Sequence, residues 1–266
     1  MKRDFSRQSF LGDDSEAILA AQKIAIIGLG GGGGHIVQQT AHLGVGIALG
    51  VDDDKCEASN LNRLIGATFA DIEQATPKAI IAERLYKGIN PGASFRPFLA
   101  KWQAVQPELV DCSVIFGAVD SFSERDQLER FARRFMIPYI DIGMDVHETE
   151  DGFKITGQVI FSAPGGPCMR CMNFITDAEL AKEAGKYGAA GAKPQVVWPN
   201  GVLASTAVGL FVQLVTPWHG NHRTAEYLVY DGNTGEIHES HRLKFALVKP
   251  CPHYRDDEVG DPFFRS

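Results

Sequence analysis

The stretch KIAIIGLGGGGGHIVQQTAHLGVGIALGVDDD, residues 23–54, decides the fold of this chain. Its apolar run at 23–27 stops at a glycine and predicts a short strand, and residues 35–43 predict the helix that follows. A second apolar run, at 47–51, stops at Asp52 and predicts another strand. Two strands joined through one helix form a βαβ unit, in which the strands are expected to lie parallel.

The same alternation of strand and helix continues along the chain. Apolar runs at 114–118 and 138–142 predict two more strands. Residues 76–87, which begin Thr-Pro-Lys, and residues 123–134 predict the helices that precede these strands; the threonine is expected to cap the first helix. Strands that alternate with helices predict an α/β fold of the Rossmann-like, doubly wound type, with a mainly parallel sheet.

The second half of the chain has a different pattern. Residues 153–161 alternate in polarity and predict a strand, and two runs at 227–230 and 236–243, separated by a Gly-containing loop, predict a hairpin. Residues 201–214 predict an apolar core helix, and the small, Gly-rich residues 184–192 predict a loop or crossover segment. We therefore expect an antiparallel C-terminal part to be added to the parallel sheet.

The composition is that of an ordinary globular protein, with 44% hydrophobic and 22% charged residues among 266. The formal net charge of −7 argues against a nucleic-acid partner. Residues 1–7 lack the apolar core of a signal peptide, and the longest apolar region, 202–215, is too short and too interrupted to span a membrane. We expect a cytoplasmic protein, whose five cysteines are reduced or bound to metal.

Glycines follow the first predicted strand at G-x-G-x-x-G spacing: Gly28, Gly30 and Gly33, with Gly31 between them. Glycine tightens the turn and lets the backbone approach a phosphate at the start of the next helix. Asp52, the acid that ends the second strand, suits the ribose hydroxyls of a nucleotide. A turn without a ligand has the same glycines, but the acid favours a nucleotide site. These residues do not separate NAD, FAD and ATP.

Further polar residues favour a triphosphate. Asn60 and Arg63 lie one turn apart, and Lys78 falls in the first turn of its predicted helix, so an amide and two cations are available for phosphate oxygens. Asp120 ends a later strand, and a carboxylate that faces phosphates is most simply explained by a bridging Mg²⁺. Singly, a surface salt bridge for Arg63 and a helix cap for Asp120 are simpler explanations. Together, the residues favour ATP.

This pattern resembles the ThiF/MoeB/HesA superfamily, the adenylyltransferases that activate ubiquitin and ubiquitin-like sulfur carriers. The resemblance covers roughly residues 5–215 at family order and spacing. It is carried by Arg7-Gln8, Gly28–Gly34, Asp52-x-Asp54, Ser59–Arg63, Lys78, and Asp120 with Arg125. The resemblance implies that the C-terminal carboxylate of a small β-grasp protein attacks the α-phosphate of ATP. Pyrophosphate then leaves, and an acyl-adenylate remains.

The resemblance also implies a role for each matching residue. Asp52 would hold the ribose and Asp120 the Mg²⁺, while Arg7 would reach into the site of a partner subunit, which implies a homodimer. The implied catalytic residues are Arg7, Arg63, Lys78 and Asp120. The implied ATP-binding residues are Gly28, Gly30, Gly31, Gly33, Asp52, Asp54, Asn60, Arg63 and Lys78.

Residues 59–66 and 194–201 look more like the bacterial members of the superfamily that occur beside conjugating enzymes. This likeness implies the activating enzyme of a bacterial ubiquitin-like conjugation system, with a ubiquitin-like β-grasp protein and a conjugating enzyme as partners. We expect a single adenylation domain over residues 1–266. Its nucleotide-binding half is expected at about 20–145 and its carrier-protein-binding half at about 146–266.

The cysteines form a second candidate site. Members of the superfamily often bind a structural zinc through two C-x-x-C pairs, and Cys168 and Cys171 form one such pair. Cys251-x-His253 stands in place of the second pair, so these four residues predict either a Cys₃His zinc site or a three-ligand or empty site. The segment 173–200 contains no cysteine. Either the enzyme stops at the adenylate, or the transfer thiol comes from elsewhere.

Several other functions share part of this pattern. An NAD-dependent dehydrogenase would share the glycines and Asp52 but would have no use for Arg63, Lys78 and Asp120. A tRNA threonylcarbamoyl-adenosine dehydratase also activates a small carboxylate, but the negative net charge argues against it. A sulfur-carrier adenylyltransferase is a further alternative. Inactive scaffold partners usually lose the arginine or the aspartate, and both are present here.

Overall fold

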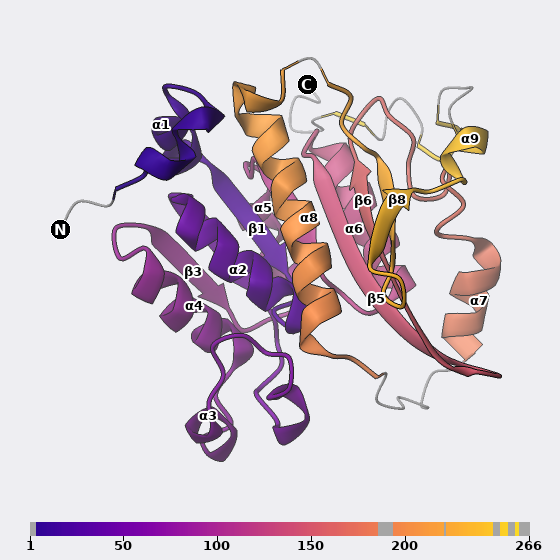
Figure 1. The fold of residues 1–266 in the computed structure, drawn as a ribbon, viewed down its shortest axis with the longest axis horizontal. Helices are drawn as coiled ribbons and strands as arrows, with labels where there is room; N and C mark the ends of the chain where they lie inside the picture. Colours follow the sequence, from indigo (N-terminus) through magenta and orange to yellow (C-terminus); the bar gives the residue numbers. More distant parts are fainter. Residues whose placement is uncertain (1–3, 186–193, 221, 247–250, 255–258, 261–266) are drawn as a thin grey trace.

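The computed structural model describes residues 4–185, 194–220, 222–246, 251–254 and 259–260. One sheet of eight strands crosses the molecule in the order β3-β2-β1-β4-β5-β6-β7-β8 (Figure 1). The strands are β1 (Lys23–Ile27), β2 (Ile47–Val51), β3 (Ser94–Phe98), β4 (Val114–Gly117), β5 (Tyr139–Thr149), β6 (Gly152–Ser162), β7 (Tyr227–Asp231) and β8 (Glu236–Glu239).

Helices connect most of the strands and cover both faces of the sheet (Figure 1). The α-helices are α1 (Ser15–Ala21), α2 (Gly31–Leu43), α3 (Phe69–Glu73), α4 (Lys78–Ile89), α5 (Gln106–Leu109), α6 (Phe122–Arg134), α7 (Asp177–Gly185), α8 (Val197–Val215) and α9 (Leu243–Ala246). The 3₁₀ turns are η1 (Ser6–Leu11), η2 (Ala58–Asn60), η3 (Trp102–Val105) and η4 (Pro217–His219).

The first five strands pair in parallel, which confirms the predicted Rossmann-like, mainly parallel sheet. The sequence patterns do not predict β3, because Arg96 and Pro97 interrupt its apolar run. β3 is an edge strand, the place in a sheet where proline is tolerated. Two boundaries also differ from expectation. The glycine run forms the first turn of α2, and Pro77 is the N-cap of α4, so the expected cap by Thr76 is wrong.

The predicted antiparallel part is also confirmed. β5 and β6 form a long hairpin whose register runs from Tyr139 opposite Ser162 to Thr149 opposite Gly152. β7 and β8 follow as the expected hairpin and pair antiparallel to β6 and to each other. β5 extends well beyond the predicted apolar run, because its second half is held by pairing with β6 more than by burial. Residues 186–192 of the expected crossover segment lie outside the described residues.

The two faces of the sheet are covered by different helices. α2, α4 and α8 cover one face, and α5 and α6 lie behind the sheet (Figure 1). Alternate residues of β1 enter the two layers: Ile24 and Ile26 pack with α2 and α8, whereas Ala25 and Ile27 pack toward α6. Because β5 runs through residue 145, the two predicted halves of the chain share one sheet, and their division by function stays a prediction.

α8 is longer than the predicted helix and begins at Val197. By length and composition alone, it is apolar enough to cross a membrane, but half of it is buried inside the protein. It packs against α2 and against β5 and β6, with Leu203, Ala207 and Phe211 among its fully buried side chains. It is therefore the core helix that the sequence predicts.

Candidate functional site

A cleft opens where the parallel strands end, the place where open α/β sheets bind ligands. Its floor is formed by the ends of β1, β2 and β4, and its rim by the segments that follow them. The polar residues that line the cleft are Asp52, Asp53, Asp54, Asn60, Arg63, Lys78, Lys101, Asp120, Glu124, Arg125, Gln195 and Asn200. The glycines that line it are Gly28, Gly30, Gly31, Gly32 and Gly143.

Glycine is required for different structural reasons at different positions of the loop after β1. Gly28 has a φ of 86°, and a Cβ on it would lie 2.5 Å from the carbonyl oxygen of Ala118. A Cβ on Gly33 would lie 1.9 Å from the carbonyl oxygen of Gly28, so α2 packs too closely on the loop for any side chain. A Cβ on Gly30 meets nothing within 4 Å. Gly28 and Gly33 shape the turn, and Gly30 leaves the approach to the N-terminus of α2 open for phosphate.

Asp52 lies at the end of β2 and shapes the same loop. Its Oδ2 accepts a hydrogen bond from the N–H of Leu29 at 2.7 Å, and its Oδ1 accepts one from the N–H of Asp54 at 2.9 Å. Only 8% of its side chain is exposed. Burial raises the pKa of Asp52, against the opposing effect of Lys78 and of the two backbone donors. The acid is therefore a fixed hydrogen-bond acceptor beside the glycine loop.

The two predicted cations lie in the cleft. Lys78 Nζ lies 2.6 Å from Asp54 Oδ2 and 3.9 Å from Asp52 Oδ1. The Nη1 of Arg63 donates to the carbonyl oxygen of Ser59 at 2.6 Å, which directs its guanidinium along the η2 segment. Asn60 also lines the cleft, and its Oδ1 accepts from the N–H of Glu57 at 3.1 Å. An anionic ligand would therefore meet cations that are held in place by neighbouring acceptors.

An ion pair between a buried carboxylate and a half-exposed guanidinium holds residues 58–73, the lobe that carries Asn60 and Arg63. Asp71 of α3 accepts from Arg84 of α4 through both carboxylate oxygens, at 2.8 and 2.7 Å, and it also accepts from the N–H and Oγ1 of Thr68. These donors hold the pKa of Asp71 well below its ordinary value, with the hydrogen bonds from Arg84 as the largest cause. The lobe is thus fastened to the helix that begins with Lys78.

Asp120 lies on the turn between β4 and α6 and is exposed to the cleft. Gln195 Nε2 approaches its Oδ1 at 3.5 Å, a long contact from the segment before α8. One carboxylate beside a phosphate site is a donor set that suits Mg²⁺, which usually takes one or two carboxylates together with the oxygens of a bound phosphate. Arg125, one turn further along α6, is buried and pairs with Asp141 at 3.1 Å.

Arg7 lies far from this cleft within its own chain. It is an exposed residue of η1, and η1 rests on the C-terminal end of α2, where Gln8 Nε2 donates to the carbonyl oxygen of Leu43 at 3.3 Å. The glycine loop is at the other end of α2, a helix of 13 residues that spans about 20 Å. Arg7 therefore does not join the other predicted site residues in one subunit.

Several residues that line the cleft are not predicted from the sequence as site residues. Lys101 follows the unpredicted strand β3, and its Nζ lies 3.5 Å from Asp53. Asn200 is buried in the first turn of α8 and would lie 2.7 Å from a Cβ on Gly31. Glu124 is half-buried, and burial raises its pKa. Only Asn200 has a sequence signal, since it belongs to the segment 194–201 that carries part of the family resemblance.

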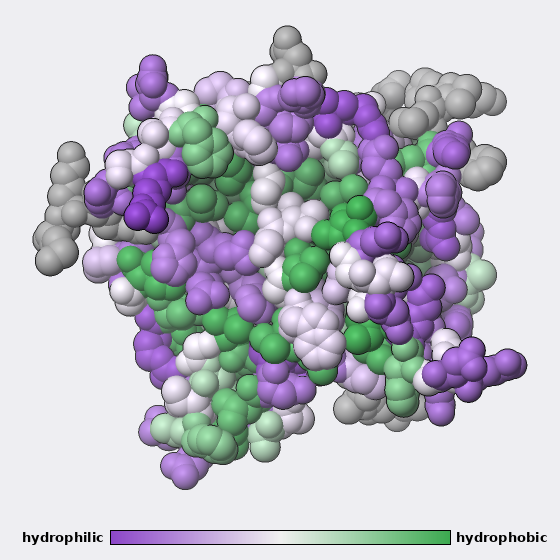
Figure 2. Space-filling view, viewed as in Figure 1, coloured by the Kyte–Doolittle hydropathy of each residue, from purple (hydrophilic) through white to green (hydrophobic). Residues whose placement is uncertain are grey.

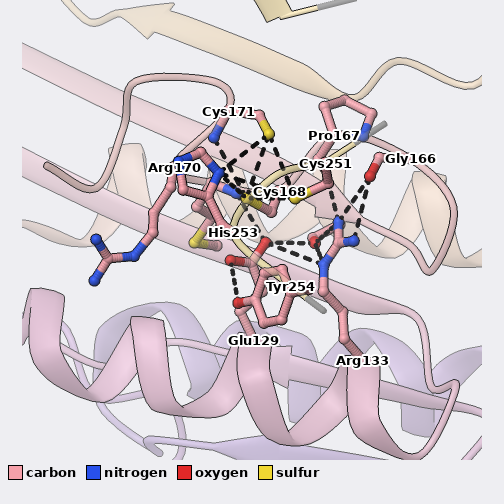
Figure 3. A network of polar contacts seen from close by, with 12 residues as sticks. Glu129, Arg133, Gly166, Pro167, Cys168, Arg170, Cys171, Cys251, His253 and Tyr254 are labelled. Carbon is pink, nitrogen blue, oxygen red and sulfur yellow. Dashed lines mark hydrogen bonds and ion pairs between the residues drawn. The ribbon is translucent and has the colours of Figure 1, made fainter. Parts of the chain in front are cut away.

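The four predicted metal ligands come together beside α6, the helix that carries Glu129 and Arg133 (Figure 3). The sulfur atoms of Cys168, Cys171 and Cys251 lie 3.4–3.6 Å from one another, and His253 Nδ1 lies 3.4 Å from the sulfurs of the first two and 3.9 Å from the third. A tetrahedral zinc with Zn–S bonds of about 2.3 Å needs ligand separations of roughly 3.5–3.8 Å. The donor set therefore fits zinc.

A buried acid, Glu129, contacts both the segment that carries Cys168 and Cys171 and the segment that carries Cys251 and His253 (Figure 3). Glu129 of α6 accepts from the N–H of Met169, from Ser162 Oγ and from the hydroxyl of Tyr254, at 2.8, 2.5 and 3.0 Å. Met169 lies inside the C-x-x-C pair, and Tyr254 follows His253. Burial raises the pKa of Glu129, against these donors. The two ligand-bearing segments are thus anchored to one side chain of α6.

The remaining two cysteines, Cys56 and Cys112, are buried among apolar residues. Cys56 packs with Leu64, the residue after Arg63, and with Ile81 of α4. Cys112 belongs to the core on the α6 side of the sheet. Burial raises the pKa of Cys112 to about 12, so this thiol is protonated at neutral pH.

Comparison with known proteins agrees with this architecture. The sequence model of the ThiF family matches residues 2–250. The sulfur carrier protein ThiS adenylyltransferase of Escherichia coli is 26% identical over 94% of this chain and 95% of that enzyme. The SAMP-activating enzyme E1 of Haloferax volcanii is 31% identical over 61% of this chain, and the match spans 57% of that enzyme.

Among solved structures, the chain has the fold of E. coli MccB crystallised with succinimide. The TM-score is 0.74 at 16% identity, over 95% of this chain and 73% of that one. The family match, the relatives named adenylyltransferases and the shared fold point the same way. The chain belongs to the ThiF family.

Proposed function

We propose that this protein adenylates the C-terminal carboxylate of a ubiquitin-like protein at the expense of ATP. One observation carries the proposal: Arg63, Lys78 and Asp120 come from three separate segments and line one cleft beside the glycine loop. Two cations and a metal-binding carboxylate suit a triphosphate better than the pyrophosphate diester of NAD. The relatives named for ThiS and SAMP support an adenylation reaction of this kind.

In this proposal, the ATP lies along the loop from the β2 end to α6. The N-terminus of α2 receives phosphate through Gly28, Gly30 and Gly31, while Gly33, predicted as a fourth binding glycine, lets α2 pack on the loop. Asp52 accepts from the ribose hydroxyls. Asp54 holds Lys78 in place, and Asn60, Arg63 and Lys78 contact the phosphates. Asp120 would hold Mg²⁺, which neutralises phosphate charge when it is bound.

The chemistry is a displacement at the α-phosphate. An oxygen of the carrier's carboxylate forms a bond to the α-phosphorus as the bond to the bridging oxygen of pyrophosphate breaks, and the electron pair leaves with pyrophosphate. No proton has to be moved, because the carboxylate attacks in its ionised form. The residues of the cleft therefore act by positioning the reactants and by neutralising negative charge.

Apolar side chains beside the cleft support a protein as the substrate that carries the carboxylate. Trp198 is 54% exposed in the first turn of α8, next to Val197 and two residues before Asn200 at the cleft. Apolar surface also lies over the lobe that carries α3 (Figure 2). Apolar side chains beside a cleft suit a protein substrate whose tail enters it. The likeness of residues 59–66 and 194–201 to bacterial conjugation systems supports a ubiquitin-like carrier with a conjugating enzyme that supplies the thiol.

We also propose that the protein is a homodimer and that it binds a structural zinc. Arg7 lies about one helix length from its own cleft, which supports an action in the site of a second subunit and hence a homodimer. The fit of Cys168, Cys171, Cys251 and His253 to tetrahedral geometry supports a structural zinc. We place the enzyme in the cytoplasm, where the thiols that bind such a zinc stay reduced.

A direct test is to incubate the protein with ATP, Mg²⁺ and small β-grasp proteins that end in an exposed glycine, and to examine each carrier by intact mass spectrometry. The expected product is a carrier that has gained one AMP at its C-terminus. ATP consumption that depends on tRNA and leaves every carrier unmodified would instead support the dehydratase alternative. AMP transfer to a carrier that then accepts sulfur would support the sulfur-carrier alternative.

A further inference from the structure

Glu183 on α7 binds the N-terminus of α6. Its Oε1 accepts from the N–H of Phe122 at 2.9 Å, and its Oε2 accepts from the N–H of Ser123 at 2.9 Å and from Ser121 Oγ at 3.1 Å. α6 has 13 residues, so its first N–H groups carry the positive end of a full helix dipole. A carboxylate from another helix thus accepts from two N–H groups of the first turn of α6 and from the hydroxyl of its N-cap.

This contact lies directly beside the proposed metal ligand. Asp120 precedes Ser121, the N-cap of α6, whose Oγ also accepts from the N–H of Glu124 at 3.2 Å. Glu183 and Ser121 thus hold the turn that directly follows Asp120. Glu183 itself is absent from the residues that line the cleft. Its contact with the nucleotide site is indirect.

The other end of α7 is also attached to α6. Arg170 Nε donates to Asp126 Oδ1 of α6 at 2.8 Å, and its Nη1 donates to Asp177 Oδ1, the first residue of α7, at 2.8 Å. Arg170 lies between Cys168 and Cys171 in the sequence, and its side chain points away from the four candidate metal ligands (Figure 3). α7 is thus held at both ends, by Arg170 at its start and by Glu183 near its end, against the helix that begins beside Asp120.

We propose that Glu183 is a positioning residue for the metal end of the nucleotide site: it caps α6 from α7 and so fixes the turn from which Asp120 faces the cleft. The inference rests on the proposed function only in taking Asp120 as the ligand of Mg²⁺. Glu183 acts through the start of α6 and is not among the residues that line the cleft. Its loss is expected to weaken binding that depends on Mg²⁺ and to leave metal-free nucleotide binding unchanged.

The test measures ATP affinity of the full chain by isothermal titration calorimetry, once with Mg²⁺ and once with EDTA, for the wild type and for Glu183→Gln. The variant keeps the shape of the side chain and removes its charge. We expect the gain in ATP affinity on adding Mg²⁺ to fall about fivefold, the size of effect that loss of a helix cap produces, while affinity in EDTA stays within about twofold.

Two further variants make the result specific. Glu179→Gln makes the same charge change one turn earlier on α7 and should bind ATP as the wild type does. Ser121→Ala removes the other side chain of the same cap and should reduce the Mg²⁺ gain in the same direction. Because both residues act on one turn, the double variant should lose less than the sum of the two single variants.

Each outcome decides the inference. An unchanged Mg²⁺ gain in Glu183→Gln would overturn it, and so would an equal loss of affinity with and without Mg²⁺, which would show a general structural role. A wild type that binds ATP and adenylates a carrier while the variant matches it would remove only this inference. A wild type that binds no ATP under either condition would remove the proposed function as well.

Discussion

The carboxylate of Asp52 accepts a hydrogen bond from the backbone N–H of Leu29 at 2.7 Å. This bond joins the end of β2 to the glycine loop after β1, across the point where the nucleotide is proposed to bind. One residue thus has two tasks: it is proposed to hold the ribose, and it fixes the loop that receives the phosphates.

The two tasks of Asp52 are separated by two substitutions. Asp52→Ala removes the ribose acceptor and the acceptor for Leu29, so we expect ATP affinity to fall by about 100-fold or more. Asp52→Asn keeps one oxygen, which is able to accept from Leu29, and should lose about tenfold. Calorimetric titration with ATP measures both. Equal affinities for the two variants would show that the Leu29 bond contributes nothing to binding.

Asp120→Ala is expected to abolish adenylation without loss of the fold. It removes a proposed metal ligand, but it removes no core volume, because the residue is exposed to the cleft. Pyrophosphate exchange measures activity, and thermal unfolding measures the fold. Asp151→Ala, an exposed residue of the turn between β5 and β6, is the matched control and should behave as the wild type does. Exchange retained in Asp120→Ala would contradict the Mg²⁺ assignment.

The cluster of Cys168, Cys171, Cys251 and His253 is expected to contain about one zinc per chain, measured by elemental analysis of the purified protein. Cys171→Ser should lose the metal and lower the melting temperature by about 10 °C, because the metal joins segments 80 residues apart in the sequence. Cys56→Ser changes a buried cysteine outside the cluster and should keep the zinc. A wild type without metal would leave the four residues as a hydrogen-bonded cluster only.

The ion pair between Asp71 and Arg84 predicts a pH-dependent stability. The side chain of Asp71 is 3% exposed and that of Arg84 is 52% exposed, so solvent screens part of the pair, and we expect Asp71→Asn to cost about 2 kcal/mol at pH 7. The pKa of Asp71 is lowered from its ordinary value of 3.8, so this stabilisation is present above about pH 4 and is lost as the pH falls further.

Chemical unfolding of the wild type and Asp71→Asn between pH 3 and pH 7 measures this dependence. The difference in unfolding free energy between the two proteins should be constant at the upper end of the range and should shrink toward pH 3. Glu108→Gln breaks the exposed pair with Arg96 and is the control, with an expected cost below about 0.5 kcal/mol. A difference that does not change with pH would refute the lowered pKa.

Arg7 is expected to act in the site of the partner subunit. Arg7→Ala and Asp120→Ala should each be inactive as homodimers. When the two variants are co-expressed, half of the dimers pair one chain of each kind, and each mixed dimer contains one site with an intact Arg7 and an intact Asp120. Activity should therefore return to about a quarter of the wild-type value. No recovery in dimers that demonstrably mix would place Arg7 outside the partner's site.

The sequence predicts the nucleotide end of this fold well, because its signals are local. The strands at 23–27 and 47–51 are found with their predicted bounds, and the glycine spacing reflects steric limits that the structure displays at Gly28 and Gly33. The strand β3 is not predicted, since Arg96 and Pro97 break its pattern and the edge of the sheet tolerates them. Local pattern says little about such edge positions.

Contacts between distant segments set the limit of prediction at the two candidate sites. The metal ligands are recognised through the family resemblance, but whether Cys251 and His253 reach Cys168 depends on how the C-terminal segment packs on Glu129. Nothing in the sequence marks Glu183 as the cap of a helix that begins 61 residues earlier. Such contacts follow from tertiary packing, and a single sequence does not reveal them.

The most direct test of carboxylate adenylation is ATP–pyrophosphate exchange with β-grasp proteins that end in an exposed glycine, beginning with any encoded beside this gene. Each carrier is tested intact and with its terminal glycine deleted. We predict exchange that requires both ATP with Mg²⁺ and the intact C-terminus of one carrier. Exchange that ignores the carrier's C-terminus, or no exchange with any such carrier from a protein that binds ATP, would contradict the proposed activity.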